Sequence, residues 1–282
     1  MAGPAVTKNL PVGPGYTGRP LVEFLSERLD LSKRKAKDII DRRNVFVNGR
    51  LVWMAQHSLR RGDRVEIVVA DVPRAEPGKQ EILFRDTHYV IVNKRPGILS
   101  CGGPASMEHE LQASLRQPRL CAVHRLDRDT SGCLMFAFNQ EAFEHMVSLF
   151  RQRKVDKKYH AIVEGMMHES RMTIDRPIAG ESSVTHIEVI SANRMASHLL
   201  ARIETGRTHQ IRRHLDSIGY RILGDRAYGV GKEIGADYRG VARQMLHASS
   251  IGFLHPVTGA KVHVTAPVPG DFMQCLKHFG LK

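Results

Sequence analysis

The sequence predicts an α+β protein whose helices and strands fall into two separate parts. Apolar residues at helical spacing, such as Leu21, Phe24 and Leu25, indicate amphipathic helices. Alternating apolar residues in segments such as 64–69 indicate half-buried strands. Residues 71–80, with two prolines and a glycine, separate the two parts, and 282 residues are enough for two domains.

The composition along the chain predicts four regions. Residues 1–18 are rich in Gly and Pro without periodicity, and we expect a mobile tail there. Residues 19–70 have their own helical and strand periods and form a first domain. Residues 71–80 are typical of a linker. Residues 81–282 form the second and larger domain.

The first domain, residues 19–70, is predicted to contain two short helices and a β-hairpin. Ser32 is positioned to cap the second helix, whose apolar face includes Ala36 and Ile40. The pair Asn48-Gly49 follows a short apolar run and is the strongest local signal for a hairpin turn. We therefore expect two helices followed by a small antiparallel sheet.

The second of these helices carries a dense group of basic residues away from its apolar face. Such a density exceeds what the solubility of one short helix requires, although a merely solvated basic face is the alternative. The basic residues are Lys33, Arg34, Lys35 and Lys37.

The charge of the chain favours a polyanionic partner. Lys and Arg number 42 against 29 Asp and Glu, which gives a formal net charge of +13 and an isoelectric point near 9.9. A membrane surface is the competing polyanion. However, no apolar stretch approaches the ~20 residues of a spanning helix, and the N-terminus lacks the apolar core of a signal peptide. We expect a cytoplasmic protein.

The cysteines and histidines do not form a recognisable metal or redox motif. The 4 cysteines, at positions 101, 121, 133 and 275, are scattered, and we interpret them as reduced and structural. None of the 15 histidines belongs to a His-Glu-x-x-His motif, and His209 with His214 has the wrong spacing for a shared ligand face. We predict no metal and no cofactor.

The segment 124–132 concentrates five ionisable side chains between two apolar runs, 120–123 and 133–138. Buried strands on both sides would hold such a loop rigidly at a sheet end, which is how catalytic groups are often carried. Residues 129–132 can simply form a turn. Asp127, next to an apolar residue and between two arginines, is suited to chemistry or to a structural ion pair.

The loop His124-Arg125-Leu126-Asp127, followed by Thr130-Ser131-Gly132, resembles the signature of the RluA-type family of RNA pseudouridine synthases. Further blocks follow in the family's order, so the resemblance covers roughly residues 80 to 282. These blocks are Val90-Ile91-Val92-Asn93-Lys94-Arg95-Pro96-Gly97, Lys157-Lys158-Tyr159, Gly206-Arg207-Thr208-His209-Gln210-Ile211-Arg212, Gly224-Asp225 with Tyr228-Gly229, Leu246-His247-Ala248 and His255-Pro256.

This resemblance implies the fold of the second domain, a mixed, mainly antiparallel β-sheet flanked by helices. Ser32-Lys33-Arg34 and the strand before Asn48-Gly49 make the first domain similar to the RNA-binding module named after ribosomal protein S-four. That module often precedes this family's catalytic domain. It implies largely sequence-blind, salt-dependent RNA affinity from the basic helix.

The segment after Gly206 is predicted to form a helix that carries an arginine at the edge of its buried face. Thr208 can cap this helix, which is expected to run to Ser217 and to be terminated by Gly219. Arg212 lies beside the apolar face, where a half-desolvated guanidinium needs a carboxylate partner. The apolar face consists of Ile211, Leu215 and Ile218.

The resemblance implies that Arg212 pairs with Asp127 and that Asp127 is the catalytic carboxylate. A surface ion pair between Arg212 and Asp216 is the alternative. Pairing with Arg212 would favour the ionised form of Asp127. Attack on the sugar, attack on the ring and proton removal all remain open as its role.

Other site residues are also assigned by resemblance. Tyr159 would lie against the target base, although strand tyrosines are usually core. Leu246 would wall the other side of the base. Arg125 would help to expel the base and fill the gap, with plain phosphate binding as the alternative. Candidates for phosphate contacts are Lys94, Arg95, Arg207 and Arg243.

The implied reaction is the cofactor-independent isomerisation of uridine in RNA to pseudouridine by a monomer. We predict large-subunit ribosomal RNA as the substrate; a transfer RNA synthase and a non-catalytic ribosome-assembly RNA-binding protein are the alternatives. A base deaminase would require His-x-Glu and Pro-Cys-x-x-Cys, which are absent. The glycines around Lys232 lack the spacing of a phosphate-binding loop.

Overall fold

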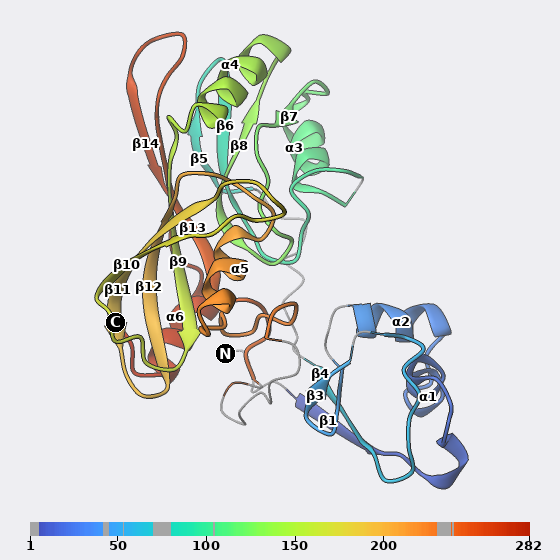
Figure 1. The fold of residues 1–282 in the computed structure, drawn as a ribbon. Helices are drawn as coiled ribbons and strands as arrows, with labels where there is room; N and C mark the ends of the chain where they lie inside the picture. The colour runs from blue at the N-terminus through green and yellow to red at the C-terminus, as the bar shows by residue number, and fades with distance from the viewer. Residues whose placement is uncertain are drawn as a thin grey trace. The chain divides into compact units, whose positions relative to one another are not determined.

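The structure is a computed structural model that describes residues 6–41, 45–52, 54–69, 80–103, 105–229, 238 and 240–282 (Figure 1). The chain divides into two compact units. The first consists of Met1–Val72 and Gly224–Arg243, and the second of Pro73–Leu223 and Gln244–Lys282.

The first unit pairs two helices with a small antiparallel sheet. The strand order is β1-β4-β2-β3. Leu21, Phe24 and Leu25 are fully buried, as their helical spacing predicts. The elements are β1 (Val6–Pro11), a 3-10 turn (Pro14–Tyr16), α1 (Leu21–Arg28), α2 (Lys33–Asp41), β2 (Val45–Val47), β3 (Arg50–Leu51) and β4 (Arg64–Val69).

Two local signals in this unit act as predicted. The Ser32 hydroxyl accepts a hydrogen bond from the Lys35 amide at 3.3 Å, which caps α2. Asn48 and Gly49 have φ angles of +52° and +77°, the left-handed pair that a tight hairpin turn requires. The Asn48 side chain also accepts a hydrogen bond from the Arg64 amide at 2.9 Å, which ties this turn to β4.

The predicted mobile tail is wrong for residues 6–18. Strand β1 pairs with β4 in continuous antiparallel register, from Val6 opposite Val69 to Pro11 opposite Arg64. The next residue, Val12, is buried in the core. The glycines and prolines concealed this strand, because its stability comes from backbone pairing with β4 rather than from a local pattern. Residues 1–5 and 71–79 of the predicted tail and linker lie outside the described residues.

The second unit is built on one large sheet. The strand order is β10-β11-β12-β9-β13-β8-β6-β5, with β14 paired to β13 and β7 to β8. Of the pairings that the structure describes, the one between β13 and β8 is parallel and the others are antiparallel. The predicted mixed, mainly antiparallel sheet with flanking helices is confirmed.

The strands of this sheet are β5 (Ile82–Arg85), β6 (Tyr89–Lys94), β7 (Cys121–Ala122), β8 (Ser131–Ala137), β9 (Asp156–Glu164), β10 (Arg171–Asp175), β11 (Val184–Ala192), β12 (Ala196–Ile203), β13 (Leu246–Leu254) and β14 (Lys261–Thr265). The helices are α3 (Met107–Leu115), α4 (Gln140–Arg151), α5 (Gln210–Ser217) and α6 (Gly270–His278). Figure 1 shows α4 beside the β5–β6–β8 end of the sheet and α5 beside its middle.

Strand β8 is buried along its whole length because both faces of the sheet are covered. Its residues alternate between two hydrophobic clusters. Leu134 and Phe136 belong to the cluster that also contains Leu215 of α5, whereas Met135 packs with Met146 of α4. The apolar run after the charged 124–132 loop is therefore a buried strand, as the sequence predicts.

The parallel pairing of β8 with β13 brings two distant segments together at the start of both strands. His247 and Ala248 lie opposite Ser131 and Gly132. Gly132 has a φ angle of +112°, and a β-carbon there would lie 2.1 Å from the Ala248 carbonyl oxygen. Only glycine permits this approach. As a result, Leu246 is brought beside the loop that contains Asp127.

The helix ends follow the sequence in part. Asn139 caps α4, since its side chain accepts a hydrogen bond from the Ala142 amide at 2.9 Å. The expected Thr208 cap of α5 is wrong: His209 is the cap residue, with a left-handed φ of +57° and no side-chain cap bond. The Gln210 side chain instead accepts a hydrogen bond from the Arg207 amide at 3.0 Å. Gly219, with a φ of +90°, ends the helix as predicted.

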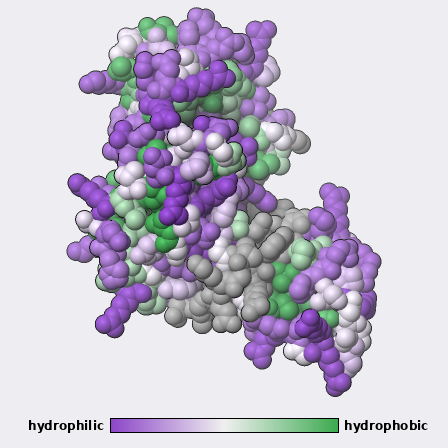
Figure 2. Space-filling view, in the orientation of Figure 1, coloured by the Kyte–Doolittle hydropathy of each residue, from purple (hydrophilic) through white to green (hydrophobic). Residues whose placement is uncertain are grey.

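The described helices are all too short or too polar to cross a bilayer. On the face of the molecule in Figure 2, hydrophilic residues predominate, and the hydrophobic ones form small separate patches.

Candidate active site

A pocket in the second unit collects residues from four separate segments. The 125–130 loop forms one side, and the start of α5 with the preceding loop forms another. Tyr159 of β9 and Leu246 of β13 complete the lining. All five pocket residues that we expected near a base, namely Arg125, Asp127, Tyr159, Arg212 and Leu246, line this one cavity.

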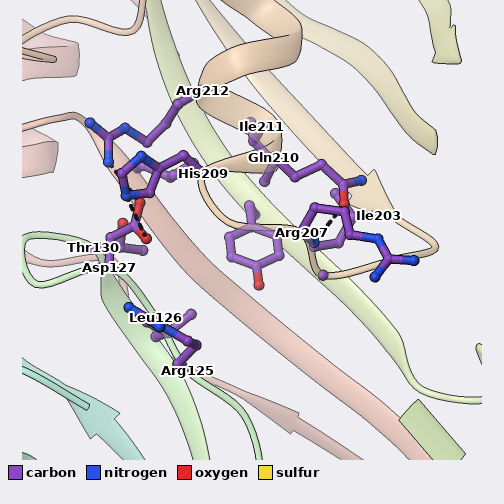
Figure 3. A pocket seen from close by; sticks show the side chains of 13 residues that line it. Arg125, Leu126, Asp127, Thr130, Ile203, Arg207, His209, Gln210, Ile211 and Arg212 are labelled. Atoms are coloured by element: carbon purple, nitrogen blue, oxygen red, sulfur yellow. Dashed lines mark hydrogen bonds and ion pairs between the residues drawn. The ribbon is translucent and has the colours of Figure 1, made fainter. Parts of the chain in front are cut away.

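Asp127 and Arg212 form the predicted ion pair across 85 residues of sequence. An Nη1 nitrogen of Arg212 donates a hydrogen bond to Oδ2 of Asp127 at 2.8 Å. The Arg212 side chain is 7% exposed and the Asp127 side chain 19%. In Figure 3, the side chains of Asp127, His209 and Arg212 point toward one another. The pair is therefore largely removed from water but accessible from the pocket.

The loop that carries Asp127 is fixed by its neighbours. The Leu126 amide donates to the Ser100 hydroxyl at 2.9 Å, and that hydroxyl donates to the Leu126 carbonyl at 2.8 Å. The Thr130 amide donates to the Asp127 carbonyl at 3.1 Å, which closes a turn. Leu126 is buried, so the loop beneath the Asp127 carboxylate is held rigidly.

Tyr159 and Leu246 supply apolar surface to the pocket. Both side chains are buried, at 8% and 4% exposure. Burial, together with the negative charge of Asp127, raises the pKa of the Tyr159 phenol. The ring therefore remains neutral and offers a flat apolar face. A cavity with one fixed carboxylate and apolar walls suits a flat heterocycle whose reaction develops charge.

Comparison with known proteins agrees with this geometry. Residues 88–217 match the family described as RNA pseudouridylate synthase. Ribosomal large subunit pseudouridine synthase D of Buchnera aphidicola is 30% identical over 298 residues, covering 93% of this chain and 94% of that protein. The protein of the same name from Pasteurella multocida is 32% identical over 295 residues, covering 92% and 91%.

The chain belongs to the RNA pseudouridine synthase family. The solved structure of human RNA pseudouridylate synthase domain containing 1 is also similar, with a TM-score of 0.58 and 27% identity over 70% of this chain and 86% of that one. The predicted enzyme class, an isomerase that forms pseudouridine in RNA, is confirmed.

One predicted substrate contact of this synthase is wrong. Lys94, at the end of β6, is fully buried, and its ammonium group donates hydrogen bonds to the carbonyl oxygens of Arg95, Ile98 and Arg128 at 3.1, 2.9 and 2.8 Å. It cannot reach a phosphate. An inward-pointing and an outward-pointing lysine at the end of a strand look the same in the sequence. Only the fold decides that Lys94 points inward.

Among the other basic candidates, Arg243 is also buried, at 3% exposure, so its predicted phosphate contact is wrong too. Arg125, Arg207 and Arg95 are on or near the surface. Arg125 is exposed and lines the pocket. Arg207 lines the pocket too, but its guanidinium forms an ion pair with Glu181, so a phosphate would compete with that carboxylate. Arg95 donates to Glu110 at 2.7 Å.

His209 is a site residue that the sequence reasoning missed. Its Nε2 nitrogen lies 3.6 Å from Oδ1 of Asp127, the oxygen opposite the one that Arg212 holds. His209 adopts a left-handed backbone conformation, with a φ of +57°, at the residue that precedes α5. The signal in the sequence was its place within the motif shared with the family.

A second group of polar side chains lies away from the pocket. Asp86, His88 and His255 bring potential metal-ligand atoms within 4.8 Å of one another. Nδ1 of His255 accepts hydrogen bonds from the Val257 and Thr258 amides at 3.2 and 3.1 Å, so the proton of the neutral ring is on Nε2. That nitrogen lies 3.0 Å from Asp86 Oδ2, without the alignment of a hydrogen bond. Since a metal would have to displace this proton, the group fits a structural histidine better than a metal site.

Proposed function

We propose that the pocket is the active site, and that this synthase converts uridine in large-subunit ribosomal RNA to pseudouridine with Asp127 as the catalytic carboxylate. The Asp127–Arg212 pair in the pocket is the observation that carries the proposal. The relatives from Buchnera and Pasteurella, both named as ribosomal large subunit pseudouridine synthases, support ribosomal RNA as the substrate.

The arrangement leaves one oxygen of Asp127 for the substrate. Arg212 holds Oδ2 through a hydrogen bond of 2.8 Å. Oδ1 lies toward His209, beyond hydrogen-bonding distance. A uracil that enters the cavity between Tyr159 and Leu246 would therefore meet a fixed negative charge. A base that fills the cavity would displace water from it, and that charge would then interact strongly with the reacting groups.

The reaction requires the target nucleotide to leave the RNA stack, at a cost of a few kcal/mol. Arg125, exposed at the rim, is placed to occupy the gap that the base leaves. The bond between N1 and the ribose then breaks, the uracil turns, and C5 bonds to the ribose. The hydrogen of C5 leaves as a proton and N1 gains one, so no atom or electron is supplied from outside.

The first unit has the complementary role of tethering RNA. Lys33, Arg34, Lys35 and Lys37 of α2 are all exposed. Their charges supply affinity that depends on salt and little on sequence. We propose that this unit acts as an RNA-binding module like that of ribosomal protein S-four, and that the protein works as a cytoplasmic monomer.

The test of catalysis is tritium release from uracil C5. Total RNA from cells that lack the gene, labelled with tritium at this position, is the substrate. The Asp127→Asn variant should stop the release while RNA binding persists, and Asp129→Asn, two residues along the same loop, is the matched control. Undiminished release by Asp127→Asn would remove Asp127 from the mechanism.

The test of the substrate is a map of pseudouridines in total RNA from cells with and without the gene. Loss of a site in large-subunit ribosomal RNA is the expected result. Loss of a site in transfer RNA alone would overturn the substrate but not the active site.

A further inference from the structure

Lys157 is a buried charged residue that the proposed reaction does not use. Its side chain lies within strand β9 with 6% exposure, two residues before Tyr159. Its ammonium group donates hydrogen bonds to the carbonyl oxygens of Thr205 and Glu204, at 3.2 and 3.5 Å. Burial lowers the pKa of Lys157 to about 8, against an opposing effect of the Asp156 carboxylate. The protein therefore keeps a charge where the charge costs stability.

The two carbonyl groups belong to the segment that leads into the pocket. Gly206, which follows Thr205 directly, lines the cavity, as do His209 and Arg212 farther along. The Thr205 hydroxyl also donates a hydrogen bond to the side-chain oxygen of Gln210 at 2.7 Å. Thr205 thus joins the Lys157 ammonium to the first residue of α5, two positions before the arginine that pairs with Asp127.

The 125–130 loop, on the other side of the pocket, is also linked to the Lys157 ammonium group. The Lys157 ammonium lies 5.5 Å from the centre of the Phe150 ring, and the His124 ring stacks on Phe150 with centres 5.2 Å apart. His124 precedes Arg125 in the loop of Asp127. Burial, reinforced by the Lys157 charge, lowers the pKa of His124 to about 4, so this ring is neutral and accepts a hydrogen bond from the Met135 amide.

We propose that Lys157 is a positioning residue: it holds the 204–212 segment so that Arg212 and His209 meet Asp127 in the geometry that the reaction requires. The inference rests on the proposed active site. A charged side chain bound to two backbone carbonyls restricts the segment in a way that an apolar side chain cannot. The fold tolerates the cost of burying the ammonium, and the benefit lies in the alignment of the pocket.

Lys157→Met separates this role from a purely structural one. Methionine keeps an unbranched stem in the core but removes the charge and the two hydrogen bonds. A positioning role predicts that the single-turnover rate of tritium release falls roughly 10- to 100-fold, since a small misplacement of reacting groups has such an effect. RNA affinity should stay within about threefold, and the unfolding temperature within about 5 °C of the wild type, because loss of the two bonds is offset by relief of the buried charge.

The matched control is Lys158→Met, on the same strand. The Lys158 side chain is 40% exposed and lies 4.0 Å from Asp156, outside the pocket. This variant should keep the wild-type rate and stability. Lys157→Arg, which keeps a charge and donors, should retain more activity than Lys157→Met.

Three results would overturn the proposal. The first is a wild-type rate for Lys157→Met. The second is a loss of rate that is matched by a loss of stability and recovered on cooling. The third is a variant that fails to fold, since the lysine would then serve the fold rather than the pocket. Asp127→Asn, measured in parallel, tests the active site separately: full activity in that variant would refute the site whatever Lys157 does.

Discussion

Helix α2 of the first unit and the pocket of the second unit use charge in opposite ways. On α2 the basic side chains are exposed, and Lys33, which pairs with Glu23 at 2.8 Å, is 70% exposed. In the pocket, Arg212 pairs with Asp127 at the same distance but is 7% exposed. Exposed charges attract a polyanion without fixing its geometry and are screened by salt. The buried pair is held in one geometry. Exposed charges therefore suit RNA binding, whereas the buried pair suits a reaction that needs fixed groups.

The largest expected effect is on catalysis. We expect Asp127→Asn to lower the rate of pseudouridine formation by roughly 10³-fold or more, because the amide cannot replace an ionised carboxylate in the reaction. Single-turnover tritium release at saturating RNA measures this effect. An equal loss in the Asp129→Asn control would mean that the loop, not the carboxylate, was disturbed.

Removal of the buried partner should affect stability as well as rate. We expect Arg212→Met to lower the free energy of unfolding by about 3–5 kcal/mol, since it leaves the Asp127 charge without its counterion. Chemical denaturation measures this change. Arg213→Met, at the next position on α5, should cost less than about 1 kcal/mol. The double variant tests the interaction. If the losses in free energy of unfolding caused by Asp127→Asn and by Arg212→Met simply add, the two side chains do not interact as the structure indicates.

Lys157 should make stability depend on pH. Its pKa in the folded chain, about 8, lies below the ordinary value of 10.5. Between these values the unfolded chain binds more protons, so the free energy of unfolding should rise with pH through this window, by up to about 3 kcal/mol. Denaturation of wild type and Lys157→Met from pH 7 to 10.5 measures the difference. Parallel curves would show that burial does not perturb this ammonium group.

The smallest effect should come from α2. Replacing Lys33, Arg34, Lys35 and Lys37 with Gln should weaken RNA binding about 10- to 100-fold at moderate salt and make the salt dependence less steep, by up to about 3 in log–log slope. The rate at saturating RNA should not change. Replacing the exposed Arg60 and Arg61 in the same unit is the control. An equal change in slope for that control would remove the special role of α2.

Much of the fold could be predicted because its signals are local. The cap at Ser32 and the turn at Asn48-Gly49 depend on neighbouring backbone groups, and each is present as predicted. Strand β1 could not be predicted, because its partner β4 is distant in sequence. The Thr208 cap failed because α5 begins one residue later, after His209, whose left-handed backbone occupies the cap position.

The site follows the same division. The pair of Asp127 with Arg212 was predicted because its residues lie in motifs that resemble those of a known family. The proximity of His209 to Asp127 was not predicted, because it depends on the entry of the chain into α5. Lys94 was wrongly placed on the surface, since a lysine beside a strand has no local feature that distinguishes an inward from an outward direction.

By itself, the sequence determined the secondary-structure periods, the positive charge and the membership of a pseudouridine synthase family, because these depend on residue identity and spacing. The tertiary structure alone decided which charges are buried. Lys157 and Lys158 are identical neighbours, yet one donates to the Thr205 and Glu204 carbonyls and the other is 40% exposed. The cost of burying a charge depends on what surrounds it, and those surroundings come from residues far away in the chain.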